Sequence, residues 1–312
     1  MINIINAQGE FATTMSGKMM GNLCGIDMPT MQRSGGAGCK FGVKRCHYRR
    51  TSGCFACLRP IALQHFRQYY QTACVKMASA FKNFGGASVY KEWIMELREF
   101  GGLTGPFVPP AHGGAPTQVM MLLHGWGADG NDLADLARPY SIRFPGMAFF
   151  VPNGPDPCKM NPAGREWFDI DDRINGPDYA ATVIKAAISA LLSAFRLTES
   201  ALVLAGFSQG GMMALHCGLR LQPAPAAIVS FSGALLRYED LSATPVTPYS
   251  PVQLVHGSAD QVVPCALMGE AVRILQPLGV VVDSVERPGL GHGIDPDGLT
   301  ASIAFLASHI TD

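Results

Sequence analysis

A serine flanked by glycines carries the strongest chemical signal in this sequence. Ser208 lies in the motif GFSQG at residues 206–210, after the apolar run 201–205 and before a stretch with helical spacing. Between a strand and a helix, this motif forms a tight turn that lifts the serine hydroxyl above the sheet. The helix N-terminus there favours a developing negative charge. A glycine-rich turn with a helix-capping serine is the alternative, and the strand–helix context favours a nucleophile.

A serine becomes a good nucleophile only beside a general base that an acid orients. In sheets of this kind the chain order is serine, acid, histidine. Asp260 follows the apolar run 252–255, and His292 follows the run 280–285. We therefore predict Ser208 as nucleophile, Asp260 as acid and His292 as base.

The other histidines and aspartates fit these roles less well. His216 falls inside the helix predicted after the nucleophile, and His309 is close to the C-terminus. His256 ends a strand, where a buried, hydrogen-bonded structural role is expected. Asp240 lies in a loop and Asp283 within a strand.

Acyl transfer also needs backbone donors for the oxyanion of the tetrahedral intermediate. One donor is the N–H of the residue after the nucleophile, here Gln209, and the second comes from an early strand–helix loop. The segment HGWG at residues 124–127 fits that loop, so we predict the Trp126 N–H as second donor. His124 is expected to hold this loop in place rather than act as acid or base.

These residues need a scaffold, and the chain from residue 118 predicts one. Short apolar runs alternate with helical stretches, which indicates an α/β fold with a parallel sheet covered on both faces. The carboxyl ends of parallel strands meet at one edge, where chemistry gathers. Strands are predicted at 118–124, 147–151, 201–205, 227–231, 252–255 and 280–285, and helices at 132–138 (ended by Pro139), 179–197, 209–219, 265–275 and 297–309.

The first 94 residues differ in composition from the rest. They hold 12 Lys and Arg against 3 Asp and Glu, and six of the nine cysteines, although the whole chain has no net charge. We therefore predict two parts: a basic, cysteine-containing extension over residues 1–94 and a catalytic domain over residues 95–312.

Several interpretations of the extension stay open. Residues 1–58 show no helical or strand period and are expected to be loop or disordered, whereas residues 61–82 fit an amphipathic helix. The single pair Cys54 and Cys57 has zinc-ligand spacing, but metal sites usually need two such pairs. The basic excess suits nucleic acid, an anionic membrane or an organelle transit peptide. The favoured interpretation is an unstructured extension, with the start of translation at Met77 or Met95 as its sharper form.

Composition excludes some broad classes of protein. Hydrophobic residues make up 48% and charged residues 15% of the 312 residues, enough for a sizeable core and unlike a wholly disordered chain. No uninterrupted apolar run reaches the roughly 20 residues that span a bilayer, and no secretory signal is visible at the start. We expect no membrane span.

From about Leu103 the chain resembles the phospholipase/carboxylesterase family of α/β-hydrolases, which includes acyl-protein thioesterases. The matching segments are collinear: LLHGWGADGNDL, NPAGREWFDI, LAGFSQGGMMAL, SFSGALL, VHGSADQVVP and GLGHGI. The resemblance implies the α/β-hydrolase fold and the same catalytic assignments, and it does not extend to residues 1–94. Trp167 and Phe168, in the second segment, are expected to border the acyl pocket or to pack beneath a loop.

The resulting functional prediction is a serine hydrolase of carboxylic esters or thioesters that works through an acyl-enzyme. We expect a small-molecule ester or thioester substrate, no metal, no organic cofactor, no nucleic-acid partner, a cytoplasmic location and, by resemblance, a possible homodimer. Three neighbouring aspartates, Asp169, Asp171 and Asp172, are expected to form a solvated turn. The alternative function is a non-catalytic binding module of the same fold with a basic interaction arm.

Overall fold

A computed structural model describes residues 39–41, 44–46, 95–241 and 248–310. The chain divides into two units, one over residues 8–90 and the other over residues 1–7 and 91–312. In the first, β1 (Cys39–Phe41) pairs antiparallel with β2 (Lys44–Cys46). The expectation of loop or disorder over residues 1–58 misses this short hairpin, because three-residue strands are too short to show an alternating pattern. The rest of that expectation lies outside the described residues. The predicted helix over 61–82 and the Cys54–Cys57 pair lie outside the described residues.

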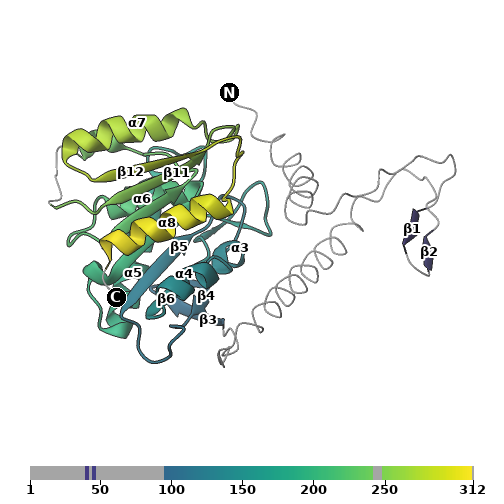
Figure 1. The fold of residues 1–312 in the computed structure, drawn as a ribbon, viewed down its shortest axis with the longest axis horizontal. Helices are drawn as coiled ribbons and strands as arrows, with labels where there is room; N and C mark the ends of the chain where they lie inside the picture. Colours follow the sequence, from purple (N-terminus) through teal and green to yellow (C-terminus); the bar gives the residue numbers. More distant parts are fainter. Residues whose placement is uncertain (1–38, 42–43, 47–94, 242–247, 311–312) are drawn as a thin grey trace. The chain divides into compact units, whose positions relative to one another are not determined.

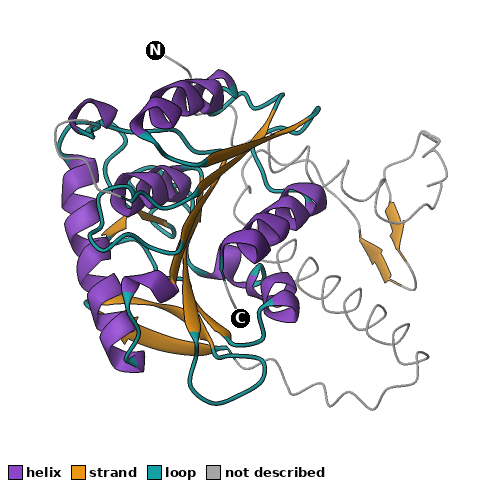
Figure 2. Cartoon of the chain, turned by 60° about the vertical axis from the view of Figure 1, so that its left-hand side comes forward, coloured by secondary structure: helices purple, strands orange, loops and turns teal. Residues whose placement is uncertain are grey.

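The second unit is built on a twisted sheet (Figures 1 and 2). Among the described residues the sheet has eight strands in the order β12-β11-β10-β9-β5-β6-β4-β3, and all neighbours are parallel except the pairs β4–β6 and β3–β4. Its strands are β3 Glu96–Phe100, β4 Leu103–Val108, β5 Gln118–Leu123, β6 Met147–Phe150, β9 Leu202–Phe207, β10 Ala227–Phe231, β11 Val252–Gly257 and β12 Val282–Arg287. A separate antiparallel pair joins β7 (Asp156–Pro157) to β8 (Arg165–Glu166).

Helices cover both faces of the sheet, which Figure 2 shows nearly edge-on. The α-helices of the second unit are α3 Asn131–Ala134, α4 Ala137–Arg143, α5 Gly176–Phe195, α6 Gln209–Gly218, α7 Ala266–Leu275 and α8 Pro296–His309, with short 3-10 turns at Glu199–Ala201, Tyr238–Asp240 and Gln276–Leu278. Buried residues of α5, α6 and α7 form one core cluster, and those of α3, α4 and α8 form another. The predicted α/β architecture is confirmed.

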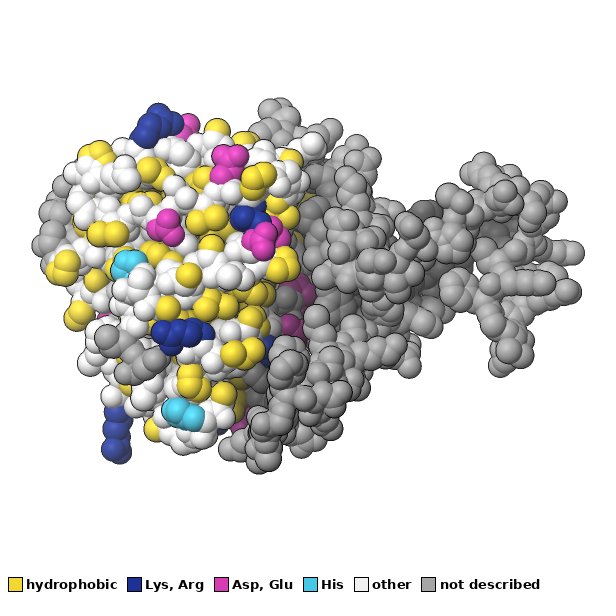
Figure 3. All heavy atoms as spheres, viewed as in Figure 1, with side chains coloured by type: hydrophobic (Ala, Val, Ile, Leu, Met, Phe, Trp, Pro, Cys, Tyr) yellow, Lys and Arg dark blue, Asp and Glu magenta, His cyan; other side chains and the backbone are white. Residues whose placement is uncertain are grey.

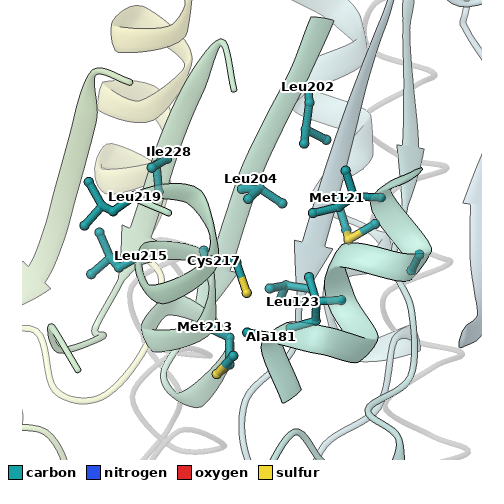
Figure 4. Packing of buried hydrophobic residues seen from close by; sticks show 14 of the residues in the cluster. Met121, Leu123, Ala181, Leu202, Leu204, Met213, Leu215, Cys217, Leu219 and Ile228 are labelled. Atoms are coloured by element: carbon teal, nitrogen blue, oxygen red, sulfur yellow. The ribbon is translucent and has the colours of Figure 1, made fainter. Parts of the chain in front are cut away.

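The continuous apolar runs of the central strands follow from this layering. In β5, Met121 and Leu123 belong to the cluster under α5 and α6, whereas Met120 and Leu122 belong to the opposite cluster. Successive side chains of a strand point to opposite faces, so a strand buried on both faces has no polar alternation. Figure 4 shows Met121 and Leu123 beside Leu204 of β9 in the first cluster.

Two local predictions need correction. The helix expected over 132–138 divides into α3 and α4, and α4 continues through Pro139. Pro139 is the third residue of α4, where a backbone N–H has no intrahelical acceptor, so its missing N–H costs nothing. The prediction also omits the β3–β4 hairpin, which turns at Gly101-Gly102 with both φ angles positive. Two glycines between short apolar segments are a typical hairpin signal.

Helix α5 explains an apolar stretch that could otherwise suggest a membrane span. Among the described residues, it is the one helix that is long and apolar enough for that purpose by length and composition alone. However, Ala180, Ile184, Ile188 and Leu191 pack into the core beneath the sheet. Core packing therefore accounts for its composition.

On the face shown in Figure 3, acidic and basic side chains are scattered among apolar and neutral ones.

Candidate active site

Three predicted residues meet at one edge of the sheet. Ser208 directly follows β9, Asp260 follows β11 by three residues, and His292 follows β12 by five. Strands β9, β10, β11 and β12 are mutually parallel neighbours, so their carboxyl ends lie side by side. The sheet thus brings together groups that lie up to 84 positions apart in the sequence.

The turn around Ser208 is strained, and its glycines permit it. Ser208 has φ 56° and ψ −120°, a backbone conformation that residues other than glycine rarely adopt. A Cβ at Gly206 would overlap the carbonyl group of Gly210, and a Cβ at Gly210 would overlap the carbonyl oxygen of Leu123. The two glycines of the motif are therefore required by close backbone approach, and together they present Ser208 at the start of α6.

His292 bridges the serine and the aspartate. Its Nε2 lies 2.9 Å from Ser208 Oγ, and its Nδ1 lies 2.7 Å from Asp260 Oδ2. A carboxylate only accepts, so Nδ1–H donates to Asp260 and Nε2 is left to accept the hydroxyl proton of Ser208. This tautomer is the one that a general base needs.

The Asp260 carboxylate is completely buried yet richly hydrogen-bonded. Its side chain has no exposed surface, and its Oδ1 accepts from the backbone N–H groups of Val262 and Val263, each at 2.9 Å. Burial alone would raise the pKa of Asp260, but hydrogen bonds from His256 and His292 hold that pKa well below its usual range. Asp260 therefore stays ionised while it orients His292.

The loop after β5 lies against the nucleophile. A Cβ added at Gly125 would come within 3.5 Å of Ser208 Cβ, so the predicted oxyanion residue Trp126 directly follows a glycine that lies close to the serine. Within the described part of the chain, the backbone N–H groups of Trp126 and Gln209 donate to no protein acceptor. Both donors are thus available to a bound oxyanion.

The side chain of Gln209 has a different task from its backbone. Its Oε1 accepts from the backbone N–H of Trp167 at 3.0 Å, and its Nε2 donates to the backbone carbonyl of Phe168 at 2.8 Å. Trp167 has no exposed surface and Phe168 only 4%, while the Trp167 indole donates to the His124 carbonyl at 2.8 Å. Of the two expectations for Trp167 and Phe168, packing beneath a loop describes their burial.

Sequence reasoning gave Glu166 no hydrogen-bond partner and no role of its own. This carboxylate is 3% exposed, and its Oε2 accepts a 2.7 Å hydrogen bond from the Trp126 indole. Beside it, Arg165 exchanges backbone hydrogen bonds with Gly127 and Ala128 at 2.9 and 2.7 Å. Strand β8 thus hydrogen-bonds both the side chain of Trp126 and the backbone of the two residues that follow it. A carboxylate next to a tryptophan is the only signal in the sequence, and it does not identify a partner.

His124 is locked in a neutral form. Its Nε2 accepts from the Gly154 N–H at 2.8 Å, so the ring proton is on Nδ1, which donates to the Gly125 carbonyl at 2.7 Å. Burial lowers the pKa of His124 to about 4. His124 therefore ties the loop after β5 to the loop after β6, in agreement with its expected loop-holding role.

The aspartates near residue 170 make local contacts. Asp169 accepts from the Asp171 N–H at 3.1 Å and pairs with Lys159, while Asp172 accepts from the Asn175 N–H at 3.0 Å. Over residues 95–241 and 248–310, no group of three or more His, Cys, Asp or Glu side chains is arranged to hold a metal ion. The expected independence from metals and cofactors stays a prediction.

Comparison with known proteins adds an independent line of evidence. The phospholipase/carboxylesterase family model matches residues 108–310. Acyl-protein thioesterase 1 of Gibberella zeae is 29% identical over 234 residues, which cover 67% of this chain and 97% of that protein. Esterase YpfH of Escherichia coli is 29% identical over 203 residues, 62% of this chain and 82% of that protein. The crystal structure of esterase PE8 is 38% identical and superposes with a TM-score of 0.63, covering 67% of this chain and 99% of that one.

Proposed function

The chain belongs to the phospholipase/carboxylesterase family, and from this premise we propose that it cleaves carboxylic esters or thioesters through Ser208, His292 and Asp260. It has the α/β-hydrolase fold and is an esterase or thioesterase-type hydrolase, as are the enzymes it is similar to. The non-catalytic alternative finds no support in these relatives. The proposal concerns the residues that carry the chemistry and the substrate.

One observation carries the residue assignment. The imidazole of His292 lies within hydrogen-bond distance of both the Ser208 hydroxyl and the Asp260 carboxylate, at 2.9 and 2.7 Å. A serine, a histidine and a buried carboxylate in this order of contacts suit the activation of a hydroxyl for acyl transfer.

The proposed cycle has two steps. In the first, Ser208 Oγ attacks the acyl carbonyl carbon while its proton moves to His292 Nε2, and the resulting oxyanion accepts from the N–H groups of Trp126 and Gln209. The C–O or C–S bond to the leaving group then breaks, and the departing alcohol or thiol takes the proton from His292. In the second step, water loses a proton to His292 and attacks the acyl-enzyme, which releases the acid and restores Ser208.

The two oxyanion donors are supported by their position. The Gln209 N–H begins α6, where first-turn N–H groups lack intrahelical acceptors and the helix dipole is positive. Trp126 follows Gly125, at which an added Cβ would lie 3.5 Å from Ser208 Cβ. Loss of one such donor typically costs about 3 kcal/mol of transition-state stabilisation.

The proposed substrate is a small-molecule ester or thioester. Two of the relatives are called an acyl-protein thioesterase and an esterase, and a buried serine, histidine and aspartate suit either leaving group. A panel of p-nitrophenyl esters and acyl thioesters of increasing chain length, assayed with one preparation, establishes the preferred acyl group. A cytoplasmic location and a homodimer stay predictions, which fractionation and light scattering test.

Replacement of Ser208 by alanine tests the proposal. We expect hydrolysis of p-nitrophenyl acetate to fall by at least about a thousandfold, because the nucleophile is gone and only binding and the oxyanion donors remain. Ser308→Ala is the matched control, since Ser308 lies in the last turn of α8 and hydrogen-bonds Phe305. Unchanged hydrolysis by Ser208→Ala would refute the assignment.

A further inference from the structure

A second imidazole reaches the same oxygen of Asp260 that binds His292. His256 is the next-to-last residue of β11; its side chain is 2% exposed, and its Nε2 lies 3.3 Å from Asp260 Oδ2. Nε2 also lies 2.8 Å from the carbonyl oxygen of Val263. We propose that His256 is a positioning residue for catalysis, which fixes the carboxylate of Asp260 so that His292 is held in its reactive orientation. This inference rests on the proposed function.

The contact with Val263 determines the protonation of His256. A carbonyl oxygen can only accept, so His256 Nε2 carries a proton and donates it. The same N–H faces Asp260 Oδ2 at the longer distance of 3.3 Å, which makes it a shared donor to two acceptors. His256 is therefore a second imidazole in contact with the catalytic acid, at a longer distance than the 2.7 Å hydrogen bond of His292.

The contacts of His256 form a closed ring around the acid. Asp260 Oδ1 accepts from the backbone N–H of Val263, and the carbonyl of Val263 accepts from His256, which in turn reaches Asp260 Oδ2. Rotation of the carboxylate about its Cβ–Cγ bond would break hydrogen bonds at both oxygens. The ring thus leaves Asp260 a single orientation, with Oδ2 directed at His292 Nδ1.

This restraint matters most when His292 carries the proton of Ser208. At that stage the imidazolium needs an ionised carboxylate at a fixed distance, and a proton transferred to Asp260 would abolish that stabilisation. A second donor on Oδ2 makes that oxygen a weaker base, so the proton stays on His292. His256 touches neither the Ser208 hydroxyl nor the His292 ring in any contact of the described residues, so its effect passes through Asp260.

Two substitutions at His256 separate this role from simple packing. In His256→Gln the amide nitrogen can occupy the position of Nε2 and keep the donor, whereas His256→Met keeps a similar volume and removes it. We expect kcat for p-nitrophenyl acetate to fall about 10- to 100-fold in His256→Met, as for loss of a hydrogen bond to a charged group. His256→Gln should stay within about threefold of the parent, and KM should change less than about twofold in both.

A double-mutant cycle with Asp260→Asn completes the test. If His256 acts through the ionised carboxylate, His256→Met should lower the rate by less than about twofold in the Asp260→Asn background. An equal loss in both backgrounds, or equal rates for His256→Gln and His256→Met, would overturn the positioning role. Should His256→Met not fold, His256→Asn takes its place, because its amide is one bond too short to reach the Nε2 position. Equal rates for the Asn and Gln variants would then overturn the role.

The Ser208→Ala variant distinguishes failure of this inference from failure of the proposed function. If Ser208→Ala retains hydrolysis, the proposed function is wrong and His256 loses its assigned role with it. If Ser208→Ala is inactive while His256→Met keeps its kcat, the proposed function stands and only the positioning role is lost.

Discussion

The aromatic ring of Phe207 lies against the imidazole of His292, with ring centroids 4.8 Å apart and planes inclined by 42°. Phe207 directly precedes Ser208, so the turn that presents the nucleophile also supports the base. The same ring lies next to Gly125, where an added Cβ would come within 3.1 Å of Phe207 Cδ1. One side chain therefore contacts the loop of the proposed oxyanion donor and the proposed base.

Removal of this ring should loosen His292. We expect Phe207→Ala to lower kcat/KM for p-nitrophenyl acetate by about 10-fold and Phe207→Leu by less, because leucine refills part of the volume without an aromatic face. Steady-state kinetics on both variants, together with their melting temperatures, provides the measurement. Parent-like kcat/KM in Phe207→Ala would show that His292 needs no support from this ring.

Close backbone approach at Gly210 predicts intolerance to any side chain. A Cβ there would overlap the Leu123 carbonyl oxygen, so Gly210→Ala must shift α6 or β5 and misplace Ser208. We expect at least about a hundredfold loss of kcat/KM, since a 1 Å misplacement of a catalytic group can cost that much.

Gly269 supplies the matched control for Gly210. It also lies in a helix, α7, but an added Cβ there would meet nothing within 4 Å. Gly269→Ala should keep full activity and raise the free energy of unfolding by about 0.5–1 kcal/mol through helix propensity. Steady-state kinetics measures kcat/KM and denaturant unfolding measures the free energy of unfolding for both variants. Equal changes of these two quantities in Gly210→Ala and Gly269→Ala would contradict the steric explanation.

Glu166 should support the proposed oxyanion loop through the Trp126 indole. In Glu166→Gln the amide oxygen can still accept from the indole N–H, whereas Glu166→Ala leaves that buried donor unpaired. We expect kcat to fall about 10-fold in Glu166→Ala and less than about threefold in Glu166→Gln. Rate constants from one ester substrate decide the matter, and a larger loss in the Gln variant would argue against a hydrogen-bonding role.

Much of this site follows from local sequence. Gly206 and Gly210 mark the turn at Ser208 because both are required by backbone contacts within a few residues or with the adjacent strand. Asp260 and His292 follow apolar runs, and parallel strands align their carboxyl ends. The positions at which these runs end, in a parallel sheet, therefore indicate that the three side chains lie at one edge of the sheet.

Contacts between distant loops could not be predicted in the same way. The hydrogen bond from Trp126 to Glu166 spans 40 positions, and no periodicity in the sequence links its partners. The Trp167 indole donates to the carbonyl of His124, which lies in the loop after β5 and 43 positions away in the sequence. These contacts arise only after the sheet has formed, because they join segments whose separation the sheet sets.

His124 predicts a specific acid sensitivity of folding. Its pKa of about 4 in the folded protein lies below the unfolded value of 6.5, so the unfolded chain binds the proton first as pH falls. The free energy of unfolding contributed by His124 is therefore constant above pH 6.5, decreases between pH 6.5 and 4, and levels off below that. The loss amounts to about 3 kcal/mol at about 1.4 kcal/mol per pH unit.

The variant His124→Gln isolates this effect. Its amide oxygen can accept from Gly154 as Nε2 does, but it does not titrate. We expect its unfolding free energy to decrease less than that of the parent between pH 6.5 and 4, measured by urea unfolding. His216→Gln should also flatten the pH profile, because burial lowers the pKa of His216 too, so comparison of the two variants separates the two contributions. Parallel pH profiles for the parent and His124→Gln would contradict the assignment.

Covalent labelling tests the central assignment most directly. A fluorophosphonate reacts only with a serine hydroxyl whose proton a neighbouring base removes, so Ser208 should acquire one adduct per chain, located by mass spectrometry of its peptide. Ser208→Ala should acquire none, and His292→Ala should react at least about a hundredfold more slowly. An adduct on another serine, or equally rapid labelling of Ser208 without the imidazole of His292, would contradict the account.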